Sequence, residues 1–161
     1  MLFVCTTQGC VSDDDSKGPS LSVGDTLPHF SVEMNNGLLV SNNSMQGKVG
    51  IIVFFNTGCG DCRKELPVIQ QIWDEFNQNP QVVIAPIARA ESEEEITDYW
   101  TANGFTMPFS PQDDRAVYEL FAQSIIPRIY ITDKDGIIKF TYDDSEMPSF
   151  NTLYSDISSL L

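Results

Sequence analysis

Two cysteines, Cys59 and Cys62, are separated by two residues at the point where an apolar run gives way to a charged segment with helical periodicity. A purely structural disulfide is disfavoured, because linking residues three positions apart closes a very small loop and removes little entropy from the unfolded chain. The same spacing suits thiol–disulfide exchange. Cys59 would precede the first helical turn, whose free N–H groups and dipole stabilise a thiolate. Cys62 would lie one turn inside the helix, placed to resolve a mixed disulfide.

A metal site is the other chemistry that a close cysteine pair can support. Structural zinc needs four Cys or His ligands, usually arranged as two close pairs. The expected folded region offers only the two cysteines and one histidine, His29. Copper binding would also need further His or Met side chains near the pair. We therefore expect no bound metal and no prosthetic group, and the redox centre would be the Cys59–Cys62 disulfide itself.

Length and charge narrow the class of protein. A chain of 161 residues is long enough for one domain with its own core and too short for two ordinary ones. Its 23 acidic residues against 9 lysines and arginines give a net charge of −14. Such a surface is repelled by phosphate backbones and by anionic lipid head groups, so nucleic-acid binding is not expected.

Residues 1–20 are expected to form a truncated leader and a flexible linker, and the domain would cover 21–161. The leader resembles the end of a bacterial lipoprotein signal, because a small residue, Gly9, precedes Cys10 and a polar tract follows. Thr7 departs from that pattern, in which an aliphatic residue is usual. The resemblance implies lipidation of Cys10 and a periplasmic or cell-envelope location, where disulfides persist. A cytoplasmic protein with an incidental tail is the alternative.

Hydrophobic periodicity predicts strands that alternate with helices. Continuous apolar runs are typical of buried strands, and apolar residues at spacings of three and four are typical of helices. Asn36–Gly37 and the DKDG stretch predict β-hairpins. The order predicts an α/β layered fold with a mixed sheet. The expected strands after the first hairpin are 49–55, 81–88, 105–109, 129–132 and 137–142, and the expected helices are 60–79, 92–103, 114–124 and 150–161.

The segment CGDCRKELP, from Cys59 to Pro67, resembles the C-x-x-C-R-x-E-x-P signature of the TlpA/ResA-like branch of thioredoxin-fold oxidoreductases, in the AhpC/TSA superfamily. VGDTLPHFSV and SIIPRIYITDKDGIIKF resemble that branch's lead-in to the active-site strand and its cis-proline loop with the closing hairpin. The resemblance covers roughly 22–161. It implies a thioredoxin-like fold, a mixed central sheet flanked by helices, with an N-terminal β-hairpin and an inserted helix–strand pair at 92–109.

The resemblance also implies roles for single residues. Cys59 would attack and Cys62 would resolve. Glu65 matches a family carboxylate that is buried beneath the disulfide and serves as acid and base, although an exposed first-turn glutamate is the alternative. Pro127 would be the cis-proline that faces the cysteine pair. Ile126 would offer the partner protein an apolar contact and a backbone segment to bind.

Gly58, Gly60 and Asp61 surround the nucleophile and are expected to contact the partner. The family usually has tryptophan at the position of Gly58 and proline at that of Asp61. A negative side chain close to Cys59 disfavours its thiolate and so destabilises the reduced form relative to the disulfide. The presence of Asp61 therefore predicts that the Cys59–Cys62 pair acts as a reductant.

The expected function is therefore that of a thiol–disulfide oxidoreductase, a monomeric reductant of the cell envelope recharged by an upstream thiol reductant. Its partner could be an apocytochrome in cytochrome c maturation, a secreted protein or another oxidoreductase. One alternative is a non-catalytic thioredoxin-fold binding module. Another is a peroxiredoxin-like peroxidase, but Ile52 and Asn56 occupy the proline and threonine positions of the peroxiredoxin P-x-x-x-T-x-x-C pattern.

Overall fold

The structure, a computed structural model, describes residues 20–161. Cys10, the predicted lipidation site, lies outside the described residues. The elements of the described chain are β1 (Ser31–Glu33), β2 (Leu39–Ser41), β3 (Val49–Phe55), α1 (Gly60–Phe76), β4 (Val82–Ala88), α2 (Glu93–Asn103), α3 (Ala116–Glu119), β5 (Arg128–Thr132), β6 (Ile138–Tyr142) and α4 (Phe150–Leu160).

A four-stranded mixed sheet with the strand order β4–β3–β5–β6 forms the centre of the fold. β3 runs parallel to β4 and antiparallel to β5, and β6 pairs antiparallel with β5. The register pairs Phe55 with Ala88 and Phe54 with Arg128. The carboxyl ends of β3 and β4 and the start of β5 therefore lie at the same edge of the sheet, which brings together the loops that carry the candidate site.

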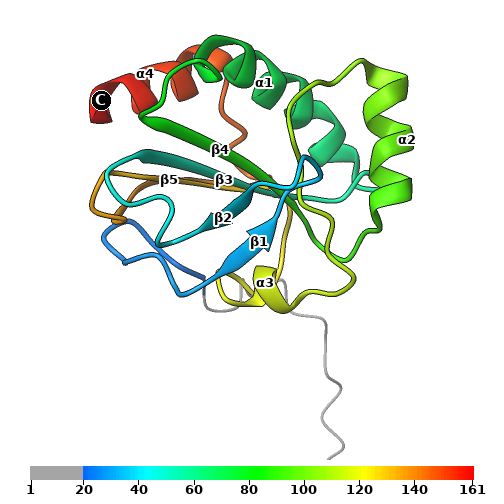
Figure 1. Cartoon of the computed structure of the whole chain (residues 1–161), viewed down its shortest axis with the longest axis horizontal. Helices are drawn as coiled ribbons and strands as arrows, with labels where there is room; N and C mark the ends of the chain where they lie inside the picture. The colour runs from blue at the N-terminus through cyan, green and yellow to red at the C-terminus, as the bar shows by residue number, and fades with distance from the viewer. Residues whose placement is uncertain (1–19) are drawn as a thin grey trace, which may run out of the picture.

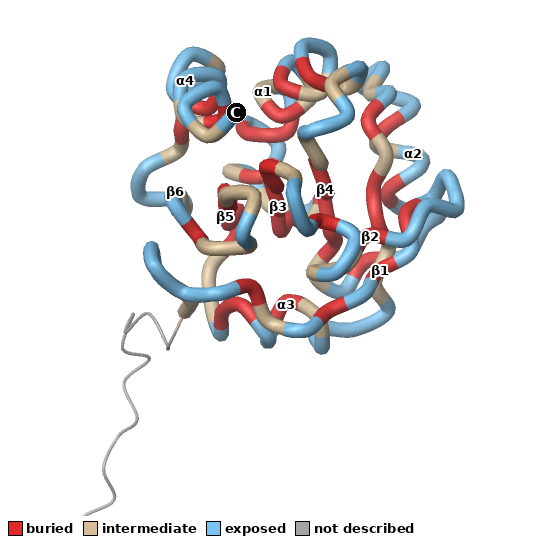
Figure 2. The backbone as a smooth tube through the Cα atoms, turned by 60° about the vertical axis from the view of Figure 1, so that its left-hand side comes forward, coloured by how far each residue is buried: buried red, intermediate tan, exposed pale blue. Residues whose placement is uncertain are grey.

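Helices and the small hairpin cover the two faces of this sheet. α1 and α4 pack against each other on one face, while α3 and the β1–β2 hairpin lie on the other (Figures 1 and 2). α2 flanks the sheet beside β4 (Figure 1). Among residues 20–161, no helix combines the length and the apolar character needed to cross a membrane. The predicted α/β architecture with a mixed sheet is confirmed.

The central strand β3 is buried along its whole length, as its apolar sequence predicts. Gly50 within it allows a close approach from the side: a Cβ there would collide with Cε of Met45 and lie 2.8 Å from Oγ1 of Thr132. Gly50 is thus a position where β3 packs too closely against its neighbours to accept a side chain.

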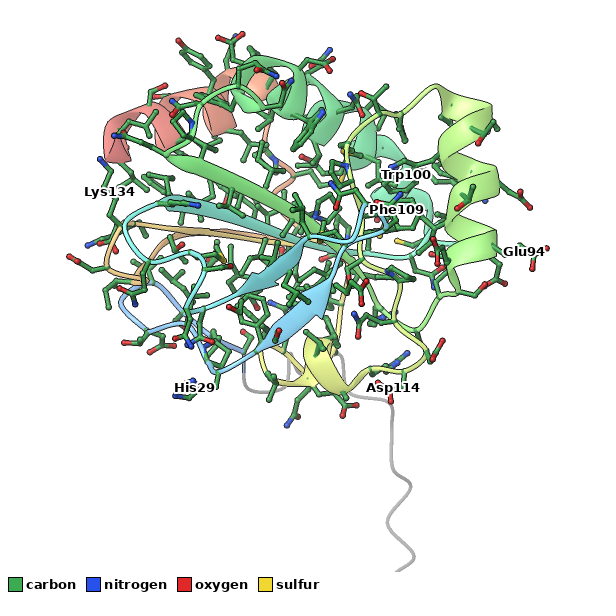
Figure 3. All side chains as sticks on the ribbon, viewed as in Figure 1. His29, Glu94, Trp100, Phe109, Asp114 and Lys134 are labelled. Atoms are coloured by element: carbon green, nitrogen blue, oxygen red, sulfur yellow. The ribbon has the colours of Figure 1, made fainter. Side chains whose placement is uncertain are left out.

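The predicted capping box of α2 is present. The Ser92 hydroxyl accepts a hydrogen bond from Glu95 N (3.4 Å), and the Glu95 carboxylate accepts one from Ser92 N (3.1 Å). The helix ends at Gly104, whose φ of 66° lies in the left-handed region that glycine adopts readily. Beneath α2, the rings of Trp100 and Phe109 pack with centroids 5.0 Å apart (Figure 3).

One predicted strand, 105–109, is wrong. Two of its backbone N–H groups donate to Oε1 of Gln70 (3.0 and 3.1 Å) and are therefore satisfied by a side chain, not by a neighbouring strand. Only Ser110 pairs with the sheet, through an isolated parallel bridge to Ile87. The inserted segment is consequently a helix followed by an extended return without a regular strand.

The predicted helix at 114–124 is also wrong in extent, because it shortens to the four residues of α3. Side chains bond the backbone beyond α3: the Tyr118 hydroxyl donates to Ile125 O (2.7 Å), and the Tyr130 hydroxyl donates to Phe121 O (3.2 Å). Ile125 itself has a left-handed φ of 73°. The chain therefore leaves the helical path to enter β5.

Candidate active site

Cys59 caps the start of α1. Its backbone is extended (φ −89°, ψ 123°), and its Sγ accepts a hydrogen bond from Cys62 N at 3.3 Å. The sulfur in this position therefore accepts from an N–H group of the first helical turn and lies at the positive end of the helix dipole. Cys59 is half-buried, so its sulfur remains within reach of a partner.

Cys62 has the opposite environment. It is fully buried, and both cysteines are free thiols in this structure. Burial, reinforced by the hydrogen bond with Cys59, raises the pKa of the Cys62 thiol well above its usual range. Cys62 is therefore held as a neutral thiol until something removes its proton.

The segment before β5 faces the nucleophile. The Ile126–Pro127 peptide bond is cis, and the Cys59 thiol donates to Ile126 O across 3.6 Å. Ile126 is 8% exposed, so it contributes mainly to the core and offers a partner little side-chain surface. Its carbonyl group, by contrast, lies directly against the reactive sulfur.

Glu65 lies three residues after Cys62 on the buried side of α1, since residues three apart share a helix face. It is 3% exposed, and its Oε1 has no hydrogen-bond partner among the described residues. Burial raises the pKa of Glu65 to about 7. The structure thus brings a carboxyl group that can both hold and release a proton near neutral pH to the helix turn next to Cys62.

The three residues around the nucleophile leave it open on one side. Gly58 and Gly60 are exposed, and a Cβ at Gly60 would meet no atom within 4 Å. Asp61 forms an ion pair with Lys64, with 2.9 Å between Oδ1 and Nζ. Because Lys64 supplies an opposite charge, the field of Asp61 at Cys59 is weaker than the sequence alone suggests.

Glu91 is a second buried carboxylate at the site, and the sequence analysis did not single it out. Its two oxygens accept hydrogen bonds from the backbone N–H (2.8 Å) and the hydroxyl of Thr57, two residues before Cys59. In the sequence, Glu91 is the first of four glutamates within residues 91–95, interrupted only by Ser92, and such a run is typical of a solvated surface. It lies in the short segment between the end of β4 at Ala88 and the N-cap Ser92, and no local pattern in the sequence separates it from its solvated neighbours.

Arg89 adds a positive charge to the buried side of the pair. Burial raises the pKa of Cys62, and the nearby Arg89 guanidinium opposes part of that rise. The guanidinium lies over the Tyr118 ring, 5.2 Å from its centroid. Arg89 N donates to Phe55 O at 2.8 Å, which fixes Arg89 beside the end of β3. Among residues 20–161, no group of three or more His, Cys, Asp or Glu side chains is arranged to hold a metal ion.

Comparisons with known proteins identify the relatives of this chain. The family model of the AhpC/TSA family matches residues 23–141. The chain is 25% identical over 117 residues to the thiol-disulfide oxidoreductase ResA of Bacillus subtilis (strain 168), covering 73% of this chain and 65% of that protein. It is 26% identical over 124 residues to the thioredoxin-like protein YneN of the same organism, covering 76% of this chain and 72% of that one. The predicted resemblance to ResA-like oxidoreductases is confirmed.

Solved structures support the same fold. The solution structure of a proposed protein disulfide isomerase from Bacteroides thetaiotaomicron superposes with a TM-score of 0.83 at 27% identity, covering 91% of this chain and 94% of that one. A thioredoxin-family thiol:disulfide interchange protein from Chlorobium tepidum TLS superposes with a TM-score of 0.72 at 20% identity, covering 88% and 99%. The predicted thioredoxin-like fold is confirmed.

Proposed function

Because the chain belongs to the AhpC/TSA family, we propose that it is a thiol–disulfide oxidoreductase that reduces disulfides in partner proteins. The observation that carries this proposal is the asymmetry of the cysteine pair. Cys59 is accessible at a helix start, whereas Cys62 is fully buried behind it. One thiol can therefore meet a partner, and the other can react only with the first.

The reaction follows from this arrangement. The Cys59 thiolate attacks one sulfur of the partner disulfide; a Cys59–partner bond forms, the partner's S–S bond breaks, and one partner thiolate leaves. Cys62 then loses its proton and attacks Sγ of Cys59, which forms the Cys59–Cys62 disulfide and releases the second partner thiolate. The partner gains two electrons and the protein loses two, which an upstream thiol reductant restores.

Glu65 is the proton acceptor for Cys62 in this proposal. Burial raises the pKa of the Cys62 thiol, so the second step needs a base close to it. Glu65 lies on the next turn of the same helix, and its Oε1 has no hydrogen-bond partner within residues 20–161. Its raised pKa of about 7 lets it accept a proton without binding it permanently. We expect Glu65→Gln to slow disulfide closure by on the order of a hundredfold, in the range typical of general-base removal.

The partner chain binds along the backbone at Ile126 and Pro127. Ile126 O lies 3.6 Å from Cys59 Sγ, so a residue bonded to that sulfur lies beside this backbone segment. Gly58 and Gly60 present no side chains above the sulfur, which lets the partner approach Cys59 closely. The site therefore recognises a main chain around a cystine and depends little on particular side chains.

The cellular setting rests on the sequence. Gly9–Cys10 and the polar tract after it favour a lipid-anchored protein of the cell envelope, where disulfides persist and an apocytochrome or a secreted protein would be the partner. Metabolic labelling with radioactive palmitate tests this part separately. Incorporation that Cys10→Ala abolishes supports the anchor, and equal labelling of both chains, or none, contradicts it.

A turnover assay separates the proposed function from its alternatives. Reduction of insulin with dithiothreitol as electron donor should be accelerated by the parent and not by Cys59→Ser. Equal background rates with both proteins would favour the non-catalytic binding module. Cys59-dependent consumption of hydrogen peroxide, with no insulin reduction, would favour the peroxidase.

A further inference from the structure

The turn that carries the nucleophile is fixed from outside by a buried carboxylate. This nucleophile turn, residues 56–59, joins β3 to α1. Within it, Cys59 N donates to Asn56 O (3.0 Å) and Gly58 N donates to Asn56 Oδ1 (2.8 Å). Thr57 takes part in neither bond, and both of its donors bind the carboxylate of Glu91.

Glu91 is suited to holding this turn and not to moving protons. It is 7% exposed, and each carboxylate oxygen accepts a hydrogen bond from Thr57. Losing these two hydrogen bonds would leave buried carboxyl oxygens without partners, which costs free energy. Glu65 differs, because its Oε1 has no partner among the described residues. The two buried carboxylates therefore have different tasks.

The backbone around Glu91 is itself held firmly. Glu91 N donates to Gln112 O (2.8 Å), and Gln112 N donates back to Glu91 O (3.2 Å). Ala90 has a left-handed φ of 54°, which is uncommon for a residue other than glycine. Its N–H donates to the carbonyl of Asp114 (3.1 Å), a residue labelled in Figure 3. The carboxylate thus projects from a braced segment onto the turn.

Thr57 is also bound from the side of the helix. Its carbonyl oxygen accepts a hydrogen bond from Nε of Arg63, whose guanidinium lies 5.4 Å from the centroid of the Tyr99 ring. The backbone N–H, the carbonyl group and the hydroxyl of Thr57 all have partners outside the turn. Thr57 is 8% exposed, so this residue is where the nucleophile turn packs against the rest of the fold.

We propose that Glu91 is a positioning residue for thiol–disulfide exchange: by binding both donors of Thr57, its carboxylate sets where Cys59 Sγ lies. This inference rests on the proposed function for its biological meaning, and its geometry stands independently. The position matters because Sγ lies 3.3 Å from Cys62 N and 3.6 Å from Ile126 O. Displacing a reacting group by about 1 Å can slow a reaction by on the order of a hundredfold.

Substitutions at Glu91 and Thr57 test the proposal. Glu91→Gln keeps the shape, since one oxygen can accept from Thr57 N–H while the amide donates to the hydroxyl oxygen. Glu91→Ala removes both interactions. Thr57→Ser keeps both donors, and Thr57→Val removes only the hydroxyl. Glu93→Ala, an exposed glutamate two residues further on, is the matched control.

The readout is the reactivity of Cys59 in reduced, folded protein whose Cys5 and Cys10 are replaced by serine in every variant. It is measured as the pH profile of alkylation by iodoacetamide and as the rate of reaction with oxidised glutathione. We expect Glu91→Ala to slow both by on the order of tenfold to a hundredfold across the pH range. Glu91→Gln, Thr57→Ser and Glu93→Ala should stay close to the parent, with Thr57→Val between the two groups.

Three results would overturn the proposal. Equal loss of reactivity in Glu91→Gln and Glu91→Ala would mean that charge and not positioning matters. A Glu91→Ala protein with parental reactivity and lower stability would mean that Glu91 is only structural. If Glu91→Ala does not fold, Thr57→Val decides, and parental reactivity in that variant contradicts the proposal. Neither readout needs a partner protein, so a failure of the proposed function in the insulin assay is distinguishable from a failure here.

Discussion

Replacing Glu65 by glutamine should stabilise the reduced protein at alkaline pH and have little effect at acidic pH. Burial raises the pKa of Glu65 from its ordinary value of 4.5 to about 7. The folded state therefore binds the proton more tightly than the unfolded chain does. Between pH 4.5 and about 7, Glu65 lowers the free energy of unfolding as pH rises, and above pH 7 the full loss is present. Glutamine carries no such dependence.

The magnitude follows from the two pKa values. At about 1.4 kcal/mol per pH unit, their difference corresponds to roughly 3 kcal/mol at pH 8 and to a few tenths at pH 4.5. We therefore expect the free energy of unfolding of Glu65→Gln, relative to the parent, to rise by about 3 kcal/mol between pH 4.5 and pH 8. The same variant should close the Cys59–Cys62 disulfide more slowly.

Urea unfolding of both proteins at the two pH values, with the thiols kept reduced, measures this difference. Glu75→Gln, an exposed position on the same helix, controls for the loss of one negative charge. A stability difference between Glu65→Gln and the parent that does not change with pH would refute the reasoning, because it would mean that Glu65 is ionised as easily inside the fold as in the unfolded chain.

Three further substitutions test the redox equilibrium of the cysteine pair and the packing around β3. Asp61→Pro should make the cysteine pair more oxidising: its equilibrium constant with glutathione should change by up to about fivefold, because an exposed charge interaction is worth at most about 1 kcal/mol. Lys64→Ala removes the counter-charge and should shift this constant the other way. A shift of the same sign in both variants would contradict the argument. Gly50→Ala should lower the free energy of unfolding by about 1–3 kcal/mol in a urea titration, because its Cβ collides with Met45; an unchanged midpoint would show that Met45 moves aside freely.

The strands and the helix that position the cysteines could be predicted from local pattern. An unbroken apolar run gives β3, and apolar spacing gives α1 with Cys59 directly before it. The strand predicted at 105–109 could not be corrected from sequence, because a distant side chain, Gln70, takes its N–H groups. Likewise, α3 is short because tyrosine hydroxyls bond carbonyl groups after it, and those bonds form only in the folded chain.

The candidate site likewise contains residues that local sequence predicts and residues that only the folded chain brings together. Cys59, Cys62 and Glu65 lie within one helix start, so their spacing alone places them on or next to one face. Ile126, Thr57 and Glu91 come together only through the register of β3 with β4 and β5. Glu91 in particular is one of several adjacent acidic residues, and nothing local distinguishes a buried carboxylate from its solvated neighbours.

The most direct measurement of the central claim is the intact mass of variants made in a background where Cys5 and Cys10 are serine, after one turnover with an oxidised peptide disulfide. Cys62→Ser should accumulate one peptide adduct, located at Cys59, because the resolving thiol is absent. The parent should instead lose two hydrogens as its disulfide forms, and Cys59→Ser should remain unmodified because Cys62 is buried. An adduct on Cys62, or no adduct in Cys62→Ser, would contradict the assignment of Cys59 as the attacking thiol.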